Sequence, residues 1–175
     1  YLKNGNYRIE KKIGEGGFGI TYQSTWFTKV SGSLGSIDAQ LPVAIKEFFF
    51  EDFFSREGNT NSITILSTTG KEIFSRFKEK LLKEAEILSK LSHPNIVRVI
   101  EVFEENNTAY MVMDYIEGDS LKDKIKNEKL SIDTSIQYIL QIADALEDVH
   151  AKNILHLDLK PSNILINKRD GRAML

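Results

Sequence analysis

Eight residues near the end of the chain, HLDLKPSN at positions 156–163, combine side chains that could support phosphoryl transfer. Asp158 could accept or orient a hydroxyl proton, and Asn163 offers a neutral oxygen of the kind that Mg²⁺ prefers. Lys160 could neutralise charge on a transferred phosphoryl group. The structural alternative is a polar turn in which Asp and Asn side chains cap backbone groups, since proline, serine and asparagine all favour turns.

A glycine cluster near the N-terminus could bind phosphate through its backbone. Gly14, Gly16 and Gly19 form a G-x-G-x-x-G pattern, and glycines let main-chain N–H groups approach phosphate oxygens. A tight hairpin without a ligand explains the pattern equally well. A β-branched strand follows, where a dinucleotide-binding fold would need a helix. A Walker-type loop at STTGKE also fails, because Glu72 occupies the Ser/Thr position.

One lysine and one glutamate each lie in an apolar pattern that would leave them in need of a partner. Lys46 ends the strand-like VAIK, where a lone lysine would ordinarily extend to solvent at a sheet edge. Glu84 lies at the edge of the apolar stripe of a helix expected over residues 72–91. A buried acid and a buried cation can satisfy each other, so the two are a candidate ion pair.

Composition indicates an ordinary globular protein. The 175 residues carry a net charge of -2, with 41% hydrophobic and 27% charged residues, so no basic field indicates nucleic acid or anionic lipid. The chain has no cysteine, and no apolar run approaches the ~20 residues that span a bilayer. We expect a soluble cytoplasmic protein with no nucleic-acid partner and no membrane segment in this chain.

The pattern of strands and helices places these residues. Five strand-like segments occupy the first two thirds of the chain, and ENN forms a turn between the last two. The Gly/Ser-rich stretch at 27–41 and the polar stretch at 51–70 are expected to be loops. A second helix is expected over 132–152, capped by Ser131 and ended by Asn153. The apolar residues at helical spacing are Ile132, Ile136, Ile139, Ala143, Leu146 and Val149.

In this order, the motifs resemble those of a eukaryotic-type serine/threonine protein kinase. The glycine loop GEGGFG, VAIK, the helix with Glu84, YMVMDYIEG and HLDLKPSN follow the family pattern over nearly the whole chain. The resemblance implies an α+β, protein-kinase-like fold. An antiparallel N-lobe with one regulatory helix would occupy residues 1–116, and the start of a truncated helical C-lobe would occupy residues 117–175.

The resemblance also implies roles for individual residues, with ATP and Mg²⁺ bound. The residues expected to contact the phosphates are Gly14, Gly16, Gly17, Phe18 at the loop tip, Gly19 and Lys46, which pairs with Glu84. The residues expected around adenine are Thr21, Ala44, Leu165, the gatekeeper Met113 and the hinge from Asp114 to Ile116. Asp158 would be the catalytic aspartate, Asn163 a Mg²⁺ ligand, and Lys160 a mark of the serine/threonine type, which favours a protein substrate.

Three departures from the family pattern qualify these expectations. Leu157 replaces an arginine that commonly binds a phosphorylated activation loop, so we expect no activation of that kind. Thr21 replaces valine and places a hydroxyl against adenine. The chain ends at INKRDGRAML, where the family continues into Asp-Phe-Gly, whose aspartate binds Mg²⁺. We therefore expect a kinase fragment with little activity alone, whose 132–152 helix exposes apolar surface.

Two other functions remain open from the sequence. One is a pseudokinase that binds nucleotide or a partner as a scaffold, and the other is a small-molecule kinase of the same fold. The presence of Lys46, Glu84, Asp158 and Asn163 together disfavours the scaffold, because a site that has lost catalysis does not need all four.

Overall fold

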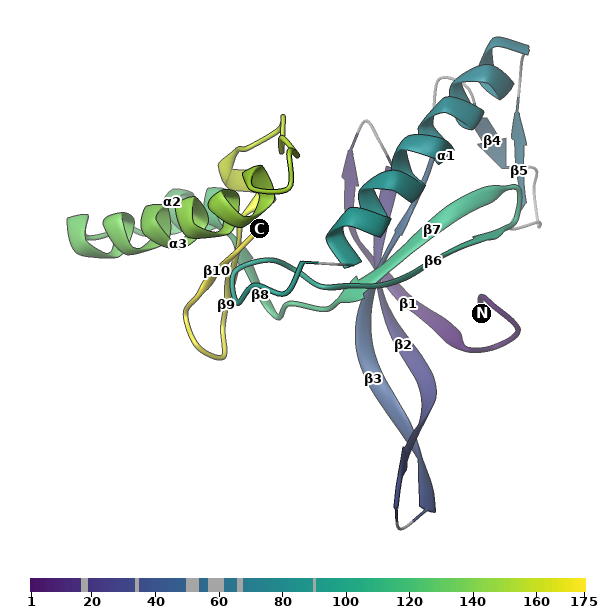
Figure 1. Ribbon diagram of the computed structural model, residues 1–175, viewed down its shortest axis with the longest axis horizontal. Coiled ribbons are helices and arrows are strands. Elements are labelled where there is room, and N and C mark those ends of the chain that lie inside the picture. The colour runs from purple at the N-terminus through teal and green to yellow at the C-terminus, as the bar shows by residue number, and fades with distance from the viewer. Residues whose placement is uncertain (17–18, 34, 50–53, 57–61, 66–67, 90) are drawn as a thin grey trace. The chain divides into compact units, whose positions relative to one another are not determined.

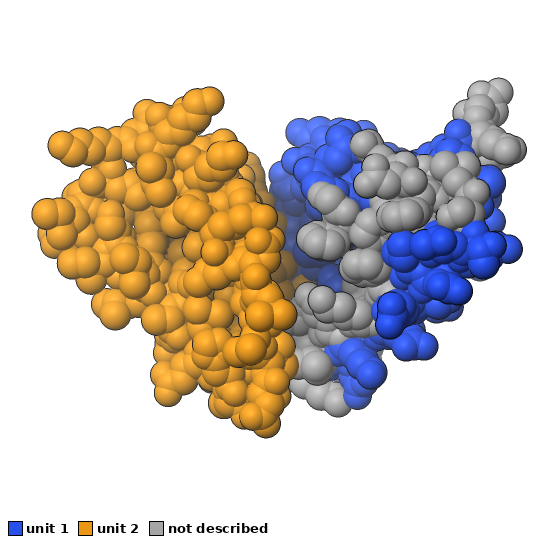
Figure 2. All heavy atoms as spheres, turned by 90° about the horizontal axis from the view of Figure 1, so that it is seen from above, with its two compact units in different colours: residues 1–89, 99–115 blue, residues 90–98, 116–175 orange. Residues whose placement is uncertain are grey.

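The chain divides into two compact units, shown in separate colours in Figure 2. The structure is a computed structural model that describes the chain except residues 17–18, 34, 50–53, 57–61, 66–67 and 90. The side chains of residues 54, 77, 80, 81, 84, 87 and 88 also lie outside the described part. The first unit comprises residues 1–89 and 99–115, and the second comprises 90–98 and 116–175.

Segment 90–98 belongs to the second unit, although a division at residue 116 was expected to leave it in the first. The side-chain amide of Asn95, which is buried, donates to the carbonyl oxygen of Ala173 at 2.8 Å. The backbone N–H of Leu175 donates to the Asn95 carbonyl oxygen, also at 2.8 Å. These contacts join the segment to the end of the chain.

A five-stranded antiparallel sheet forms the frame of the first unit, with the strand order β1-β2-β3-β7-β6 (Figure 1). The strands are β1 (Tyr7–Gly16), β2 (Gly19–Gly32), β3 (Gly35–Glu47), β6 (Val99–Glu105) and β7 (Thr108–Asp114). Asn106 and Asn107 form the expected turn between β6 and β7, with φ angles of 55° and 60°. The predicted antiparallel N-lobe sheet is confirmed.

The two faces of this sheet carry separate buried clusters, because successive side chains of a strand point to opposite faces. Tyr110 and Val112 of β7 pack with Ile45 on one face, and Met111 packs with Val99 on the other. Ile45 and Val112 are fully buried, and burying such a side chain stabilises the fold by about 1.5–3 kcal/mol. The cluster containing Met111 also contains residues of the helix that follows the polar stretch at 51–70.

That helix, α1 (Thr68–Ser89), begins earlier than the expected 72–91 and lies alongside β6 (Figure 1). Its residues Ala85 and Phe74 pack in the cluster of Met111. Part of the segment before the helix is strand. It forms a small hairpin of β4 (Phe54–Arg56) and β5 (Ile63–Ile65), so the expectation of a loop over 51–70 is wrong for these described strands.

The expectation of a flexible loop at 27–41 is also wrong. Strands β2 and β3 pair in continuous register from Ile20↔Glu47 to Gly32↔Gly35. The part of β2 after Trp26 does not pair with β1, and the part of β3 before Val43 does not pair with β7. These two parts therefore project from the sheet as a ribbon (Figure 1). Val30 and Ile37 face each other in this ribbon, and both are exposed.

The second unit contains short elements around one long helix. They are β8 (Gly118–Ser120), α2 (Leu121–Asn127), α3 (Ile132–His150), the 3-10 helix η1 (Pro161–Asn163), β9 (Leu165–Asn167) and β10 (Ala173–Met174). The three strands form a sheet in the order β10-β9-β8. The predicted cap of α3 is confirmed, since Ser131 Oγ accepts from the Thr134 N–H at 3.1 Å. Asn153 has the expected positive φ of 59°. Helix α2 was not predicted.

Helix α3 is buried on a different face from the one that its isoleucines suggested. Tyr138 and Ile142 pack against β9 and β10 residues such as Ile166 and Ala173. The large apolar side chains that this helix exposes are Ile132, Ile136, Ile139 and Leu140. The expected apolar surface on this helix is therefore present. Among the described helices, none is long and apolar enough to cross a membrane.

Candidate active site

One face of the first unit's sheet gathers the residues expected to hold a nucleotide. Thr21 of β2 lies opposite Lys46 of β3, and Lys46 lies opposite Met111 of β7. Ala44 lies two residues before Lys46 and opposite Met113, so these side chains share a face. The structure thus brings the expected residues of β2, β3 and β7 together on the face where α1 packs.

The glycine loop connects β1 to β2, with Gly16 paired to Gly19, while Gly17 and Phe18 lie outside the described residues. Gly19 has a φ of +142°, and a Cβ there would lie 2.0 Å from the backbone oxygen of Glu47. Packing therefore requires glycine at position 19. A Cβ on Gly14 would make ordinary contact with Thr21 at 3.7 Å, and one on Gly16 would meet nothing within 4 Å. The fold alone does not require glycine at positions 14 and 16.

The predicted pair of Lys46 and Glu84 stays a prediction. Lys46 is half-buried, with its Nζ 5.9 Å from the centroid of the Phe48 ring. The side chain of Glu84 lies outside the described part, although the helical backbone at this position is described. Its neighbour Ala85 is buried in the cluster with Phe48, which shows that this part of α1 lies against the sheet.

The expected adenine and hinge residues lie at the ends of short elements. Asp114 is the last residue of β7, opposite Val43, and Ile116 is the second residue beyond it. Leu165 begins β9 in the second unit, where it pairs with Ser120 and Met174. Asp114, Ile116 and Leu165 are all half-buried.

In the second unit, the loop after α3 brings together two predicted catalytic residues, Asp158 and Lys160, and the predicted Mg²⁺ ligand Asn163. Lys160 Nζ lies 2.8 Å from Asp158 Oδ2. The Asn163 side-chain amide donates to Asp158 Oδ2 at 2.9 Å and to the Asp158 carbonyl oxygen at 2.8 Å. These hydrogen bonds from Lys160, and then Asn163, lower the pKa of Asp158 from its ordinary value of 3.8. The carboxylate is therefore ionised at neutral pH and remains half-exposed, with a side-chain exposure of 54%.

Two further residues shape this loop. The backbone N–H of Asp158 donates to the His156 carbonyl oxygen at 2.8 Å, which gives His156 a role that the sequence did not reveal. Leu157 between them has a positive φ of 58° and an exposure of 82%. The tight reversal at Leu157 directly precedes Asp158, whose carboxylate contacts Lys160 and Asn163.

Glu47 is a buried charged residue that the sequence analysis missed. Its side chain is 1% exposed and forms an ion pair with Arg56 of β4. The signal in the sequence was its place directly after Lys46, on the alternate face of the same strand. Tyr22 and Tyr110 also donate to its carboxylate, at 2.9 and 3.1 Å.

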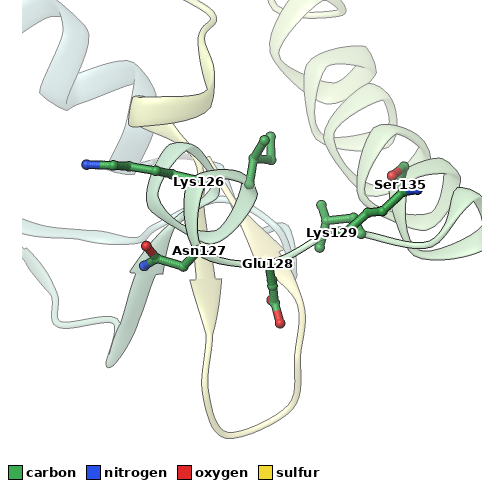
Figure 3. Close-up of a pocket in the computed structure, with 7 residues that line it drawn as sticks. Lys126, Asn127, Glu128, Lys129 and Ser135 are labelled. Atoms are coloured by element: carbon green, nitrogen blue, oxygen red, sulfur yellow. The ribbon is translucent and has the colours of Figure 1, made fainter.

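A hollow of about 570 Å³ beside α2 and the beginning of α3 is not part of the predicted site. Its lining includes Lys126, Asn127 and Glu128, whose side chains point in different directions in Figure 3. Polar groups that converge on one point are what a specific small-molecule site requires. We therefore assign no ligand to this hollow.

Comparison with known proteins gives consistent results for sequence and fold. The profile of the family described as the protein kinase domain matches residues 56–175. The chain is 29% identical to the serine/threonine-protein kinase PknA of Nostoc sp. over 99% of this chain and 27% of PknA. It is 36% identical to calcium-dependent protein kinase 4 of Plasmodium falciparum over 74% of this chain and 25% of that protein.

A solved structure, the apo form of PpkA-294, matches over 100% of this chain and 58% of its own, with a TM-score of 0.84 and 27% identity. The chain therefore spans about a quarter of these two curated relatives and more than half of the solved one. Because the family profile covers most of the chain and the fold matches throughout, the chain belongs to the protein kinase domain family.

Proposed function

We propose that the protein containing this chain is an ATP- and Mg²⁺-dependent serine/threonine kinase that transfers the γ-phosphoryl group to a protein hydroxyl. The observation that carries the proposal is the contact of Asp158 with both Lys160 and Asn163. An ionised carboxylate held beside a cation and a neutral amide is the arrangement that transfer to a hydroxyl requires.

The roles in the second unit follow from these contacts. Asp158 would accept the proton of the substrate hydroxyl, and its lowered pKa keeps it available for that purpose. Lys160 would stabilise negative charge on the transferred group. Because the Asn163 amide nitrogen donates to Asp158, its amide oxygen is directed elsewhere and is a suitable ligand for a hard cation.

The donor set fits a metal that arrives with the nucleotide. Within the described residues, no cluster of three or more His, Cys, Asp or Glu side chains could hold a metal ion by itself. Mg²⁺ keeps several water ligands and commonly takes the rest from one or two protein oxygens and substrate phosphates. When bound, it would neutralise charge on the phosphates. Asn163 is the residue of this chain that would bind it.

The roles in the first unit follow from the shared face of its sheet. Lys46 would bind the α and β phosphates and pair with Glu84. The backbone of the glycine loop from Gly14 to Gly19 would cover the phosphates. The open space at Gly16 and the ordinary contact distance at Gly14 support this role, since the fold alone does not explain glycine at either position. Ala44 and Met113, with Thr21 beside them, would contact adenine, together with Leu165 of the second unit and the hinge residues Asp114 to Ile116.

A substrate panel tests the proposal. The intact protein should transfer phosphate from labelled ATP to a generic protein substrate with serine and threonine, and should leave sugars and aminoglycosides unlabelled. Asp158→Asn should lower the rate by about 10²- to 10⁴-fold, whereas Asp148→Asn on the exposed surface of α3 should not. Labelling of the small molecules alone would indicate a metabolite kinase, and nucleotide binding without transfer would indicate a scaffold.

The activity is proposed for a protein that contains the family's further segments. The 175 residues span 58% of the solved relative's chain, and α3 exposes four large apolar side chains. We propose that residues 1–175 alone have little activity. Robust single-turnover transfer by the purified 175-residue chain would contradict this part of the proposal.

A further inference from the structure

The hairpin of β4 and β5 contacts both faces of the first unit's sheet. Arg56 and Ile63 lie opposite each other in this hairpin. Ile63, which is 1% exposed, packs in the cluster of Met111 and Ala85. Arg56 instead forms an ion pair with Glu47, which lies opposite Tyr110 and so shares the other face with it. The hairpin therefore contacts both faces of the sheet at the edge where β3 ends and β7 begins.

The carboxylate that pairs with Arg56 is held in place by hydrogen bonds from neighbouring strands of the sheet. The carboxylate of Glu47 accepts hydrogen bonds from Tyr22 and Tyr110, which lie on the strands either side of β3. Burial, followed by the charge of Glu47, raises the pKa of Tyr22 to about 12, so its hydroxyl remains a donor. Among the described residues, Arg56 is the cation paired with this carboxylate.

The other side of the hairpin is fixed by backbone and side-chain contacts. The N–H of Ile63 donates to the Asn106 carbonyl oxygen at 2.9 Å. The Asn107 side-chain amide donates to the Ile63 carbonyl oxygen at 3.3 Å. Both asparagines belong to the turn between β6 and β7, so the hairpin is attached to the sheet at two separate places.

The hairpin is also joined to α1. Strand β5 ends at Ile65, α1 begins at Thr68, and Figure 1 shows the hairpin next to the beginning of the helix. Ile65 of β5 and Phe74 of α1 both pack against the cluster that contains Met111. The position of the hairpin on the sheet therefore restrains the position of the helix that carries Glu84, relative to the strand that carries Lys46.

We propose that Arg56 is a positioning residue of the kinase site. By its ion pair with Glu47, directly after Lys46, it fastens the hairpin and hence α1 to the lysine strand. The inference rests on the proposed roles of Lys46 and Glu84. A buried carboxylate left without its cation is strongly unfavourable. The ion pair therefore favours a single position of the hairpin on the sheet.

The test compares three variants of the intact protein with the wild type. Arg56→Met removes the charge and keeps most of the length of the side chain, and Arg56→Lys restores a cation. The double variant E47Q/R56M removes the buried charge together with its partner. Arg8→Met is the matched control, because Arg8 forms an exposed pair with Glu10 in the same unit. The measurements are backbone amide hydrogen exchange, kcat and KM for ATP, and the thermal midpoint.

For Arg56→Met we expect exchange in β4, β5 and the first half of α1 to accelerate, while exchange in β1 and β2 stays as in the wild type. We expect kcat to fall by about 10- to 100-fold, as small displacements of catalytic groups can cause. Arg56→Lys should recover most of kcat, and Arg8→Met should match the wild type. The double variant should recover the thermal midpoint but keep the fast exchange and the low kcat.

Two results would overturn the proposal. The first is unchanged exchange in α1 when Arg56 is replaced. The second is full recovery of exchange and kcat by E47Q/R56M, because Arg56 would then only compensate a buried charge. If Arg56→Met does not fold, the double variant provides the same two readouts. If the wild-type protein transfers no phosphate, the proposed function fails, while the exchange measurement still decides whether Arg56 fastens α1.

Discussion

The side-chain amide of Asn163 donates to two oxygen atoms of Asp158, the carboxylate Oδ2 at 2.9 Å and the backbone carbonyl at 2.8 Å. One side chain thus fixes both the backbone and the carboxylate of the proposed proton acceptor. Asn163 lies five positions after Asp158, at the end of η1, which turns the chain back so that the two residues meet. The contact accounts for the placement of an asparagine at this spacing.

The first prediction concerns the charge of Asp158. Its pKa in the folded state is lower than 3.8, so the stability that its contacts contribute is present above pH 3.8 and is lost as the pH falls through the lower folded value. Lys160→Met should raise the pKa of Asp158 toward 3.8, and Asn163→Leu should do so to a smaller extent. A carboxyl-carbon NMR titration measures these values, and a pKa unchanged in Lys160→Met would contradict the role of that contact.

The second prediction concerns Lys46. Lys46→Ala should abolish phosphoryl transfer and weaken binding of an ATP analogue, because the ammonium would act mainly on the bound phosphates. Folding should change little, since the side chain is only half-buried. Calorimetric titration and thermal denaturation give the two readouts. Lys29→Ala in the exposed ribbon is the control, and a large loss of stability in Lys46→Ala without weaker nucleotide binding would assign Lys46 a structural role.

The third prediction separates the glycines of the loop. Gly19→Ala should destabilise the fold by about 1–3 kcal/mol, because its Cβ would collide with the Glu47 carbonyl oxygen at a φ of +142°. Gly16→Ala should change stability by less than about 0.5 kcal/mol but weaken binding of nucleotide. Denaturant unfolding and nucleotide titration distinguish the two. Nucleotide affinity that is unchanged in Gly16→Ala would support a hairpin that binds no phosphate.

The fourth prediction concerns regulation. Leu157 is 82% exposed and carries no hydrogen-bond donor on its side chain, so it cannot hold a phosphorylated loop as an arginine would. Turnover of the phosphatase-treated protein should therefore match that of the untreated protein. Mass spectrometry of both samples would verify the phosphorylation states. A loss of turnover by orders of magnitude after dephosphorylation would show that another residue replaces the arginine.

The order of the motifs allowed the family and much of the fold to be predicted from the sequence. The segments around VAIK and YMVMD are short, apolar and rich in residues that favour strands, a pattern typical of a buried sheet. The contacts of Asp158 follow from residues within a single loop, where spacing limits the geometry. Contacts limited in this way to one short loop can be predicted from the sequence.

The strands within the stretches at 27–41 and 51–70 could not be predicted from the sequence, because they depend on contacts with other parts of the chain. Glycine and serine at 31–36 suggested a loop, but strand pairing depends on the partner strand, and the register of β2 with β3 continues as far as Gly32↔Gly35. The hairpin of β4 and β5 depends on the ion pair with Glu47 and on the turn at Asn106, and this turn is distant from the hairpin in the sequence. On α3, helical spacing fitted two apolar faces, and only packing shows that Tyr138 and Ile142 occupy the interior.

The projecting ribbon makes the length of this part of the chain largely independent of the rest of the fold. From Thr28 to Gln40, β2 and β3 pair only with each other, so adding or deleting a matched pair of residues near Gly32 and Gly35 shifts no other ladder. The tip is therefore a natural place for length variation among homologues. It is also a suitable insertion point for an epitope tag or a fluorescent label, because the nucleotide face of the sheet would keep its register.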